Sequence, residues 1–223
     1  MGPTNYQGFQ NYDFVEISTG VAFASGDFSG PTTDVGFQGF ADMGWSLRAG
    51  LGFHVNEMLS ISGRISYSNL SVNKEKMIAH TEKVTGENIL SATTSSWHIT
   101  SFFVGPSIIY SEGFFFFNFG GKLGLNGVTS PNIEMVYSDF SSEGMIYQQQ
   151  SIGYGPGFQV EAQFGYRINE IIGLSLGYDY SQTQAHFQSV LWEYKNGINQ
   201  KIDFDEQIQL SNLSLNIIFY LEN

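Results

Sequence analysis

The chain contains four histidines, His54, His80, His98 and His186, whose side chains are the ones best suited to acid–base or metal chemistry near neutral pH. They lie far apart in the sequence, and no two have the short spacing of a shared metal site. His98 and His186, with Ser or Asp neighbours, are the first candidates for a catalytic base. The spread is more typical of histidines at rims and in loops, so the sequence predicts no catalytic, cofactor-binding or metal residues, and no cofactor.

Seven charged residues are more informative, because each falls on the polar side of a segment in which apolar and polar residues alternate. Opposite charges that share one side of such segments are expected to form a hydrogen-bonded network in an enclosed interior. Lys122 and Glu161 stand at similar distances from their turns on segments expected to be adjacent, so they are expected to pair. The seven residues are Glu16, Arg48, Arg64, Lys122, Glu161, Arg167 and Asp179.

The alternation is clearest between residues 157 and 181, where Asn169-Glu170 separates two alternating runs. A period of two is typical of a strand whose two faces meet different environments, so this stretch is predicted to be a β-hairpin. Each run lasts about ten residues, with large apolar side chains on one face and small or hydrogen-bonding groups on the other. That pattern is typical of transmembrane β-strands, whose apolar face meets lipid, rather than of a soluble sandwich.

Eight such segments are expected along the chain, in one domain of residues 13–223 that follows a leader of residues 1–12. Long connections follow the first, third, fifth and seventh segments, at about residues 26–41, 73–95, 129–155 and 182–206. The others are short turns, as in outer-membrane barrels. The fourth segment, residues 97–110, has apolar residues on both faces, so its faces stay unassigned. In the last segment the apolar parity changes after Ile208 and Leu210, which predicts a bulge near Ser211-Asn212.

Composition excludes several classes of function. The net charge is −12, with nine Lys and Arg residues, which disfavours nucleic-acid binding. The longest apolar run, Ile217 to Leu221, is far shorter than the roughly 20 residues of a membrane-spanning helix. The glycine-rich stretch Gly153 to Gly157 lacks the following Lys-Ser or Lys-Thr of a phosphate-binding loop, so it is interpreted as the entry to a strand. Trp45, Trp97, Tyr178 and Tyr180 are expected in an aromatic girdle at one membrane interface.

With this pattern in view, residues 13–221 resemble the small eight-stranded outer-membrane barrels of the OmpX and OmpA-transmembrane-domain type. The last segment also resembles the assembly signal of such proteins at Asn212, Ile217 and Phe219, although Ser214 stands where Gly is usual. The resemblance implies an all-β, antiparallel up-and-down barrel in a Gram-negative outer membrane, with short periplasmic turns, long extracellular loops and a lumen filled by side chains. It also implies contact with outer-membrane lipid and lipopolysaccharide, and with the assembly machinery during biogenesis.

The long connections contain two further hairpin patterns. Residues 133–137 are expected to pair with 145–147, and residues 186–192 with 198–204 across Asn196-Gly197, a strong hairpin signal. Both ribbons are expected to extend above the membrane and to present apolar residues to a protein partner. The candidate partner-binding residues are Met135, Tyr137, Tyr147, Val190, Leu191 and Trp192.

The function expected from these features is a structural or interaction role without catalysis, in which the chain contacts other molecules through its external ribbons. A sharper version is an accessory subunit of a larger outer-membrane complex. The main alternative is a small pore or carrier for small or apolar solutes. A lipid-modifying enzyme is a third hypothesis, and a soluble lipocalin-like carrier is a fourth, which the lipid-like outer faces oppose.

Overall fold

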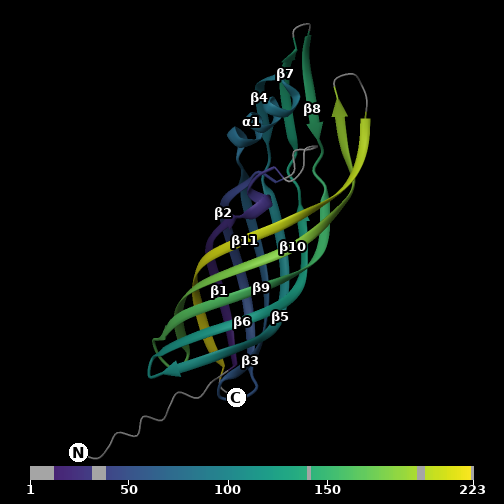
Figure 1. Cartoon of the computed structure of the whole chain (residues 1–223). Coiled ribbons are helices and arrows are strands. Elements are labelled where there is room, and N and C mark those ends of the chain that lie inside the picture. Colours follow the sequence, from purple (N-terminus) through teal and green to yellow (C-terminus); the bar gives the residue numbers. More distant parts are fainter. Residues whose placement is uncertain (1–12, 32–38, 140–141, 195–198, 222–223) are drawn as a thin grey trace, which may run out of the picture.

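The structure, a computed structural model, describes residues 13–31, 39–139, 142–194 and 199–221; the expected leader lies outside these residues. Eight antiparallel strands form a closed ring (Figure 1). The ring closes at β1, where Val15 lies opposite Leu51 of β2 and Phe219 of β11. This is the eight-stranded barrel that the sequence predicts. In ring order its strands are β1 (Asp13–Ala24), β2 (Ala41–His54), β3 (Leu59–Val72), β5 (Trp97–Glu112), β6 (Phe115–Thr129), β9 (Ile152–Arg167), β10 (Ile172–Tyr194) and β11 (Asn199–Leu221).

Side chains alternate between the outer wall and the lumen along these strands, because successive residues of a strand point to opposite faces. In β9, Phe164 and Tyr166 are exposed on the outer wall, whereas Glu161 and Gln163 are buried inside. The outer wall is therefore apolar and the middle of the lumen is polar, which is the reverse of a soluble barrel. Four basic side chains of the barrel strands, those of Arg48, Arg64, Lys122 and Arg167, all point inward.

Asparagine side chains shape two of the tight turns at one end of the barrel, which we call the lower end. Asn56 Oδ1 accepts hydrogen bonds from the backbone N–H groups of Met58 and Leu59, at 2.9 and 2.8 Å. Asn169 Oδ1 does the same for the N–H groups of Ile171 and Ile172, the latter being the first residue of the next strand. In the third turn Gly113 has φ of 59°, a conformation that glycine adopts without steric cost.

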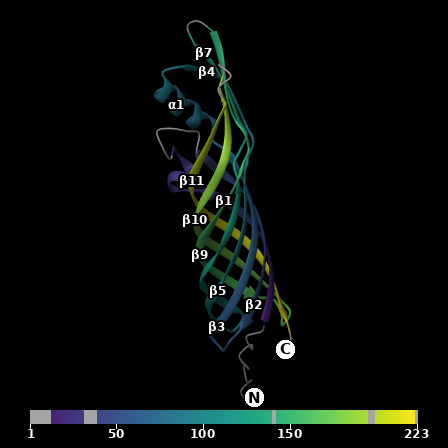
Figure 2. The ribbon, with the colours of Figure 1, turned by 90° about the vertical axis from the view of Figure 1, so that its right-hand side faces the viewer.

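The opposite, upper end carries the long connections (Figures 1 and 2). There β10 and β11 continue past the barrel as a ribbon, which β8 (Ser142–Gln148), β7 (Ile133–Asp139) and β4 (Asn88–Thr94) extend into a sheet. Both expected hairpins are present, with Met135 opposite Ile146 and Glu193 opposite Asn199. The Asn196-Gly197 pair lies outside the described residues.

The sequence prediction of a plain polar loop at residues 73–95 is wrong, because this connection contains helix α1 (Lys74–Thr85) as well as β4. Asn73 caps the helix by accepting a hydrogen bond from Lys76 N at 3.0 Å, and Gly86 ends it in a left-handed conformation. The helix buries only Met77 and Thr81. With so few buried positions, the sequence shows only a weak apolar periodicity from which the helix could be predicted. Within the described residues no helix is long and apolar enough to cross a membrane.

The prediction of a bulge near Ser211-Asn212 is also wrong. Pairing of β10 with β11 runs without a shift from Ile172 to Phe187, and the register changes only between Phe187 and Val190. Ser189, at that irregularity, has φ of 53°. Ile208 and Leu210 face the lumen in the same parity as Asn212, because the lumen itself turns from polar to apolar at this height.

The change of the lumen from polar to apolar along its axis also explains why both faces of β5 carry apolar residues. Phe102 and Val104 lie on the outer wall, whereas Ile99 and Ile109 point into apolar regions of the interior near its two ends. Trp97, expected in the outer aromatic girdle, is instead 1% exposed inside the upper barrel. Its indole Nε1–H donates to Gly39 O at 3.2 Å, which satisfies the one polar group of the ring.

Candidate functional site

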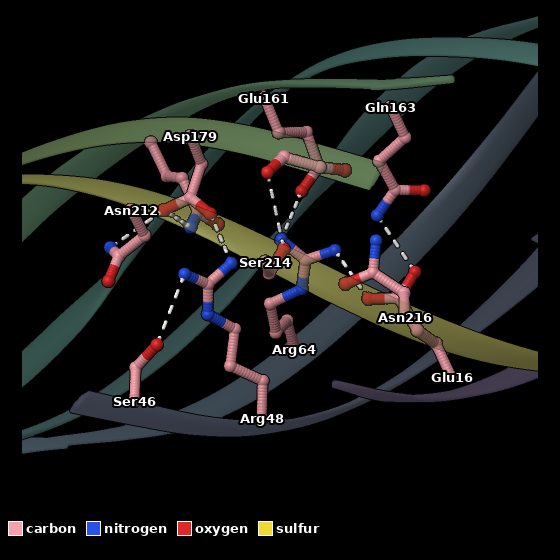
Figure 3. Close-up of polar contacts among 12 residues, drawn as sticks. Glu16, Ser46, Arg48, Arg64, Glu161, Gln163, Asp179, Asn212, Ser214 and Asn216 are labelled. Carbon is pink, nitrogen blue, oxygen red and sulfur yellow. Dashed lines mark hydrogen bonds and ion pairs between the residues drawn. The ribbon is translucent and has the colours of Figure 1, made fainter. Parts of the chain in front are cut away.

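The middle of the lumen holds a network of buried ion pairs from strands on opposite sides of the barrel (Figure 3). Arg64 binds Glu16 at 2.8 Å and Glu161 at 2.5 Å, and Glu161 also contacts Lys122. Beside this group, Arg48 contacts Asp179. The structure therefore pairs Lys122 with Glu161, as the sequence predicts, and links both to an arginine across the lumen.

Amide side chains complete the network. Gln159 Nε2 and Asn212 Nδ2 donate to the same oxygen of Asp179, at 3.0 and 3.1 Å, and Gln163 Nε2 donates to Glu16 at 2.8 Å. Buried charges are costly unless they are paired and hydrogen-bonded; Glu16 and Asp179 each have a cation and an amide donor, and Glu161 has two cations. The network thus fills the cross-section of the barrel with groups that hold one another in place.

Arg167, the seventh predicted network residue, lies outside this group. Its guanidinium sits 4.4 Å from the ring centroid of Tyr220, near the lower end. A small apolar cluster surrounds this contact, formed by Phe14, Ile109, Phe116, Ile218 and Tyr220. The cavity bordered by this cluster has a volume of only about 20 Å³, room for about one water molecule.

Above the network, the upper barrel is closed by an apolar core that the sequence pattern does not reveal. Phe28, from the 3₁₀ turn η1 (Gly26–Ser29), packs edge-on against Trp97 with ring centroids 5.2 Å apart, and Phe40 is also fully buried. Both lie in a connection without periodicity, so alternation could not assign them. The only sequence signal is the presence of large aromatic residues in a glycine-rich loop. Trp97, Phe187, Ile208 and Leu210 from the strands and Met77 from α1 belong to the same core.

This core corrects part of the expected partner-binding surface. Met135 is 0% and Val190 1% exposed, because both point into the apolar core rather than toward solvent. Tyr137, Tyr147 and Leu191 are half-buried. Trp192 pairs through its backbone with Gln200 and Gln148, while its side chain lies outside the described residues.

The three residues of the expected assembly signal lie on β11 but on different faces. Asn212 is buried in the lumen, whereas Ile217 is exposed on the outer wall and Phe219 is half-buried with outward parity. Their role in recognition by the assembly machinery remains a prediction.

The histidines do not converge on a common site. His98 Nδ1 lies 2.7 Å from Tyr67 Oη, and His186 Nδ1 lies 2.6 Å from Asp205 Oδ1 on the exposed ribbon. Because β6 and β9 separate β5 from β10 in the ring, these two histidines are on strands roughly 14 Å apart. His54 packs near Phe14 at the lower rim, and His80 packs near Phe40. No group of three or more metal-ligating side chains occurs in the part of the chain that the structure describes.

Neither a protein-family model nor a curated protein sequence matches the chain. Among solved structures, it is similar to a major outer membrane protein of Thermus thermophilus, with 8% identity, a TM-score of 0.49, and 95% of this chain and 100% of that chain covered. Neisserial surface protein A has 15% identity, a TM-score of 0.48, and coverage of 94% and 97%. The outer membrane protein OprG of Pseudomonas aeruginosa has 12% identity, a TM-score of 0.46, and coverage of 96% and 99%. The closed strand register of this chain, and not these similarities, establishes its barrel fold.

Proposed function

We propose that this chain is a non-conducting, non-enzymatic barrel of a Gram-negative outer membrane that acts as an interaction protein through its upper end. The observation that carries the proposal is the filling of the interior at three successive levels. These are the lower apolar cluster, the ion-pair network and the upper apolar core. Among the described residues these three levels interrupt any continuous polar path for solutes, so the activity is expected at the surfaces of the barrel.

The outer wall supports the placement in a membrane. Leu47, Leu123 and Leu176 are among many large apolar side chains left exposed around the barrel, whereas Arg48, Lys122 and Asp179 of the same strands are buried inside. Water would disfavour such an apolar wall, and lipid would favour it. The inward position of the charges agrees with this placement, since a cation on the lipid face costs roughly 2–4 kcal/mol near the midplane. The short turns would then face the periplasm, and the upper end would face the exterior.

The free edge of β4 is the feature best suited to bind a protein. In the described part of the chain β4 pairs with β7 alone, and it has no charged residue. The other end of this upper sheet, at β11, carries Lys201, Asp203 and Asp205, charges that discourage edge pairing. At this edge the backbone N–H of Ile89 already donates to Glu82 Oε1 of α1 at 3.0 Å, so it is the part beyond Ile89, beside the exposed Leu90, that fits an extended segment of a partner chain added as a further strand.

The test is the native mass of the protein extracted from its own membranes in mild detergent, with the co-purifying chains identified. A stoichiometric partner is expected, and Leu90→Lys should remove it because a charge at the edge opposes strand addition. Val84→Lys is the matched control, since Val84 on α1 is 52% exposed, as Leu90 is. A lone particle of 24.8 kDa plus detergent would contradict the interaction role.

A further inference from the structure

We propose that the lower end of the barrel is a second interaction surface, on which a two-fold symmetric protein of the periplasm with basic side chains docks through two equivalent turns. This inference goes beyond the role proposed for the upper end, and it rests on the membrane placement, which puts the tight turns in the periplasm. Three observations carry it: two turns share one design, they lie opposite each other, and their end of the barrel is acidic and apolar.

The turns at residues 55–59 and 168–172 share one design. Each is an apolar residue followed by Asn, Glu and two further apolar residues. The first N–H donates to the last C=O, at 2.8 Å in one turn and 2.9 Å in the other, and in both the Asn Oδ1 accepts from the fourth and fifth N–H groups. The third turn, around Gly113, has no such Asn, and its Phe114 packs against Tyr166 of the outer wall with ring centroids 5.7 Å apart.

The two equivalent turns lie on opposite sides of the lower mouth of the barrel. One joins β2 to β3 and the other joins β9 to β10, and in the ring order equal numbers of strands lie between them in both directions. An eight-stranded barrel is roughly 16 Å across, given a strand spacing of about 4.8 Å and a tilt of about 40°. Half a rotation about the barrel axis therefore brings one turn close to the position of the other. The turns thus present two equal surfaces to a partner whose own two-fold axis lies on the barrel axis.

Each of these turns contains an exposed apolar residue with the parity of the lumen and not of the lipid-facing wall. The C=O of Met58 accepts from the N–H of Ile109 at 2.8 Å, and Ile109 is buried in the lower apolar cluster. In the same way the C=O of Ile171 accepts from the N–H of Tyr220, another member of that cluster, at 2.8 Å. Yet Met58 is 56% and Ile171 59% exposed, because both lie just outside the barrel strands. They extend the apolar cluster to the surface at the mouth, where a protein partner can cover them.

The charge of the lower end defines the chemistry of that partner. Glu57 and Glu170 are exposed in the two equivalent turns, and Glu112 is exposed beside the third. Among the described residues no Lys or Arg side chain is exposed at this end; Arg167 is 3% exposed inside the barrel, and His54 is half-buried at the rim. Such a surface repels phosphate groups and a second copy of itself. It fits a protein whose Lys or Arg side chains border an apolar pocket, and a homodimer presents two such pockets.

Photo-crosslinking in intact cells tests the proposal, with the photoreactive residue benzoylphenylalanine in place of Met58, Ile171 or Phe114. The variants at Met58 and Ile171 are expected to trap the same periplasmic chain. The Phe114 variant is the matched control at the same end and should not trap it, because Phe114 packs toward the outer wall. Native mass spectrometry of the complex in mild detergent should find two copies of the trapped chain for each barrel.

Charge reversal tests whether the two turns bind one partner together. Glu57→Lys should lower crosslinking from position 171, on the opposite turn, at least about tenfold, because the loss of one of two linked contacts removes the avidity of the other. Glu170→Lys should do the same to crosslinking from position 58. Glu112→Lys makes the same change of charge at the third turn and should leave both yields near those of the wild type.

Different chains at positions 58 and 171, adducts with phospholipid, or no adduct at either position would overturn the docking surface. Crosslinking from position 171 that is insensitive to Glu57→Lys would overturn joint binding, and a single copy of the trapped chain in each complex would overturn the two-fold partner. Leu90→Lys, which is expected to remove a partner from the upper end, should leave the lower complex intact, so the two proposals can fail separately. Every variant must migrate as a heat-modifiable band in electrophoresis without boiling, which shows that the barrel is folded.

Discussion

At the scale of single residues, Glu161 is the member of the lumen network with the most cationic partners. It binds Arg64 and Lys122 together, and all three side chains are almost completely buried. Removing one partner of a buried ion pair leaves the other charge uncompensated. The folded protein is then destabilised by more than the intact pair stabilised it. Arg64 keeps Glu16 as a second partner, whereas in the described part of the chain Lys122 forms an ion pair with Glu161 alone. The network is therefore more sensitive at Glu161 than at its outer members.

Glu161→Gln should lower the free energy of unfolding by about 3–5 kcal/mol, because two buried cations lose their shared carboxylate. Urea unfolding of the protein refolded in lipid vesicles measures this change. Glu170→Gln, in an exposed lower turn, removes the same charge and should stay within about 0.5 kcal/mol of the wild type. Equal stability of the two variants would mean that the network does not contribute to holding the barrel together.

At the scale of the strand, the parity of β11 remains constant while the chemistry of its inner face changes. Asn212, Ser214 and Asn216 face the polar lumen, and Ile208 and Leu210 face the upper apolar core in the same register. A bulge would have placed Ile208 on the outer surface. The two interpretations therefore differ in which side chains of the upper β11 a water-soluble reagent can reach.

The chain has no cysteine, so single cysteines introduced into β11 can be labelled without background. Asp205→Cys should react rapidly with a water-soluble maleimide, because Asp205 is exposed on the ribbon. Ile208→Cys should be protected at least about tenfold in the folded protein, since a buried thiol reacts only through the slow opening of the core. Labelling of both positions at similar rates in the folded state would support the bulge instead. As a control, both cysteines should react at equal rates in denaturant.

At the scale of the whole molecule, the barrel and the upper cap form one continuous interior. The upper core receives side chains from β1, β2, β3, β5, β6, β10 and β11 and from the long connections, so the cap does not pack as a separate layer on an open barrel. Phe28 and Phe40 seal the interior from a connection, and α1 adds Met77. This arrangement supports the proposal that the barrel acts through its surfaces.

Planar bilayers containing the wild-type protein should show no unit conductance steps, because three filled levels block the lumen. Steps that change when Arg64 or Lys122 is replaced by Ala would contradict this expectation and indicate a pore. A preparation counts in this test only if electrophoresis without boiling shows the heat-modifiable band, so that silence cannot come from unfolded protein.

The sequence by itself determined the number of barrel strands, the face on which most residues lie, the position of the tight turns and the pairing of Lys122 with Glu161. These features follow from a local rule. A strand between lipid and an enclosed lumen alternates with a period of two, and charges such as Arg64 are excluded from its lipid face. Neighbouring strands joined by tight turns then have a register that can be counted from Asn56, Gly113 and Asn169.

Only the tertiary structure decided what fills the upper lumen and which residues of the ribbons remain accessible. An inward residue such as Ile208 shares its apolar core with Phe28, Phe40 and Met77, which belong to segments that lack barrel periodicity and are distant in the sequence. The same long-range packing buries Met135, which alternation alone cannot distinguish from an exposed apolar residue. A period of two reports which face a side chain takes, but the environment of that face depends on the segments that fold over it.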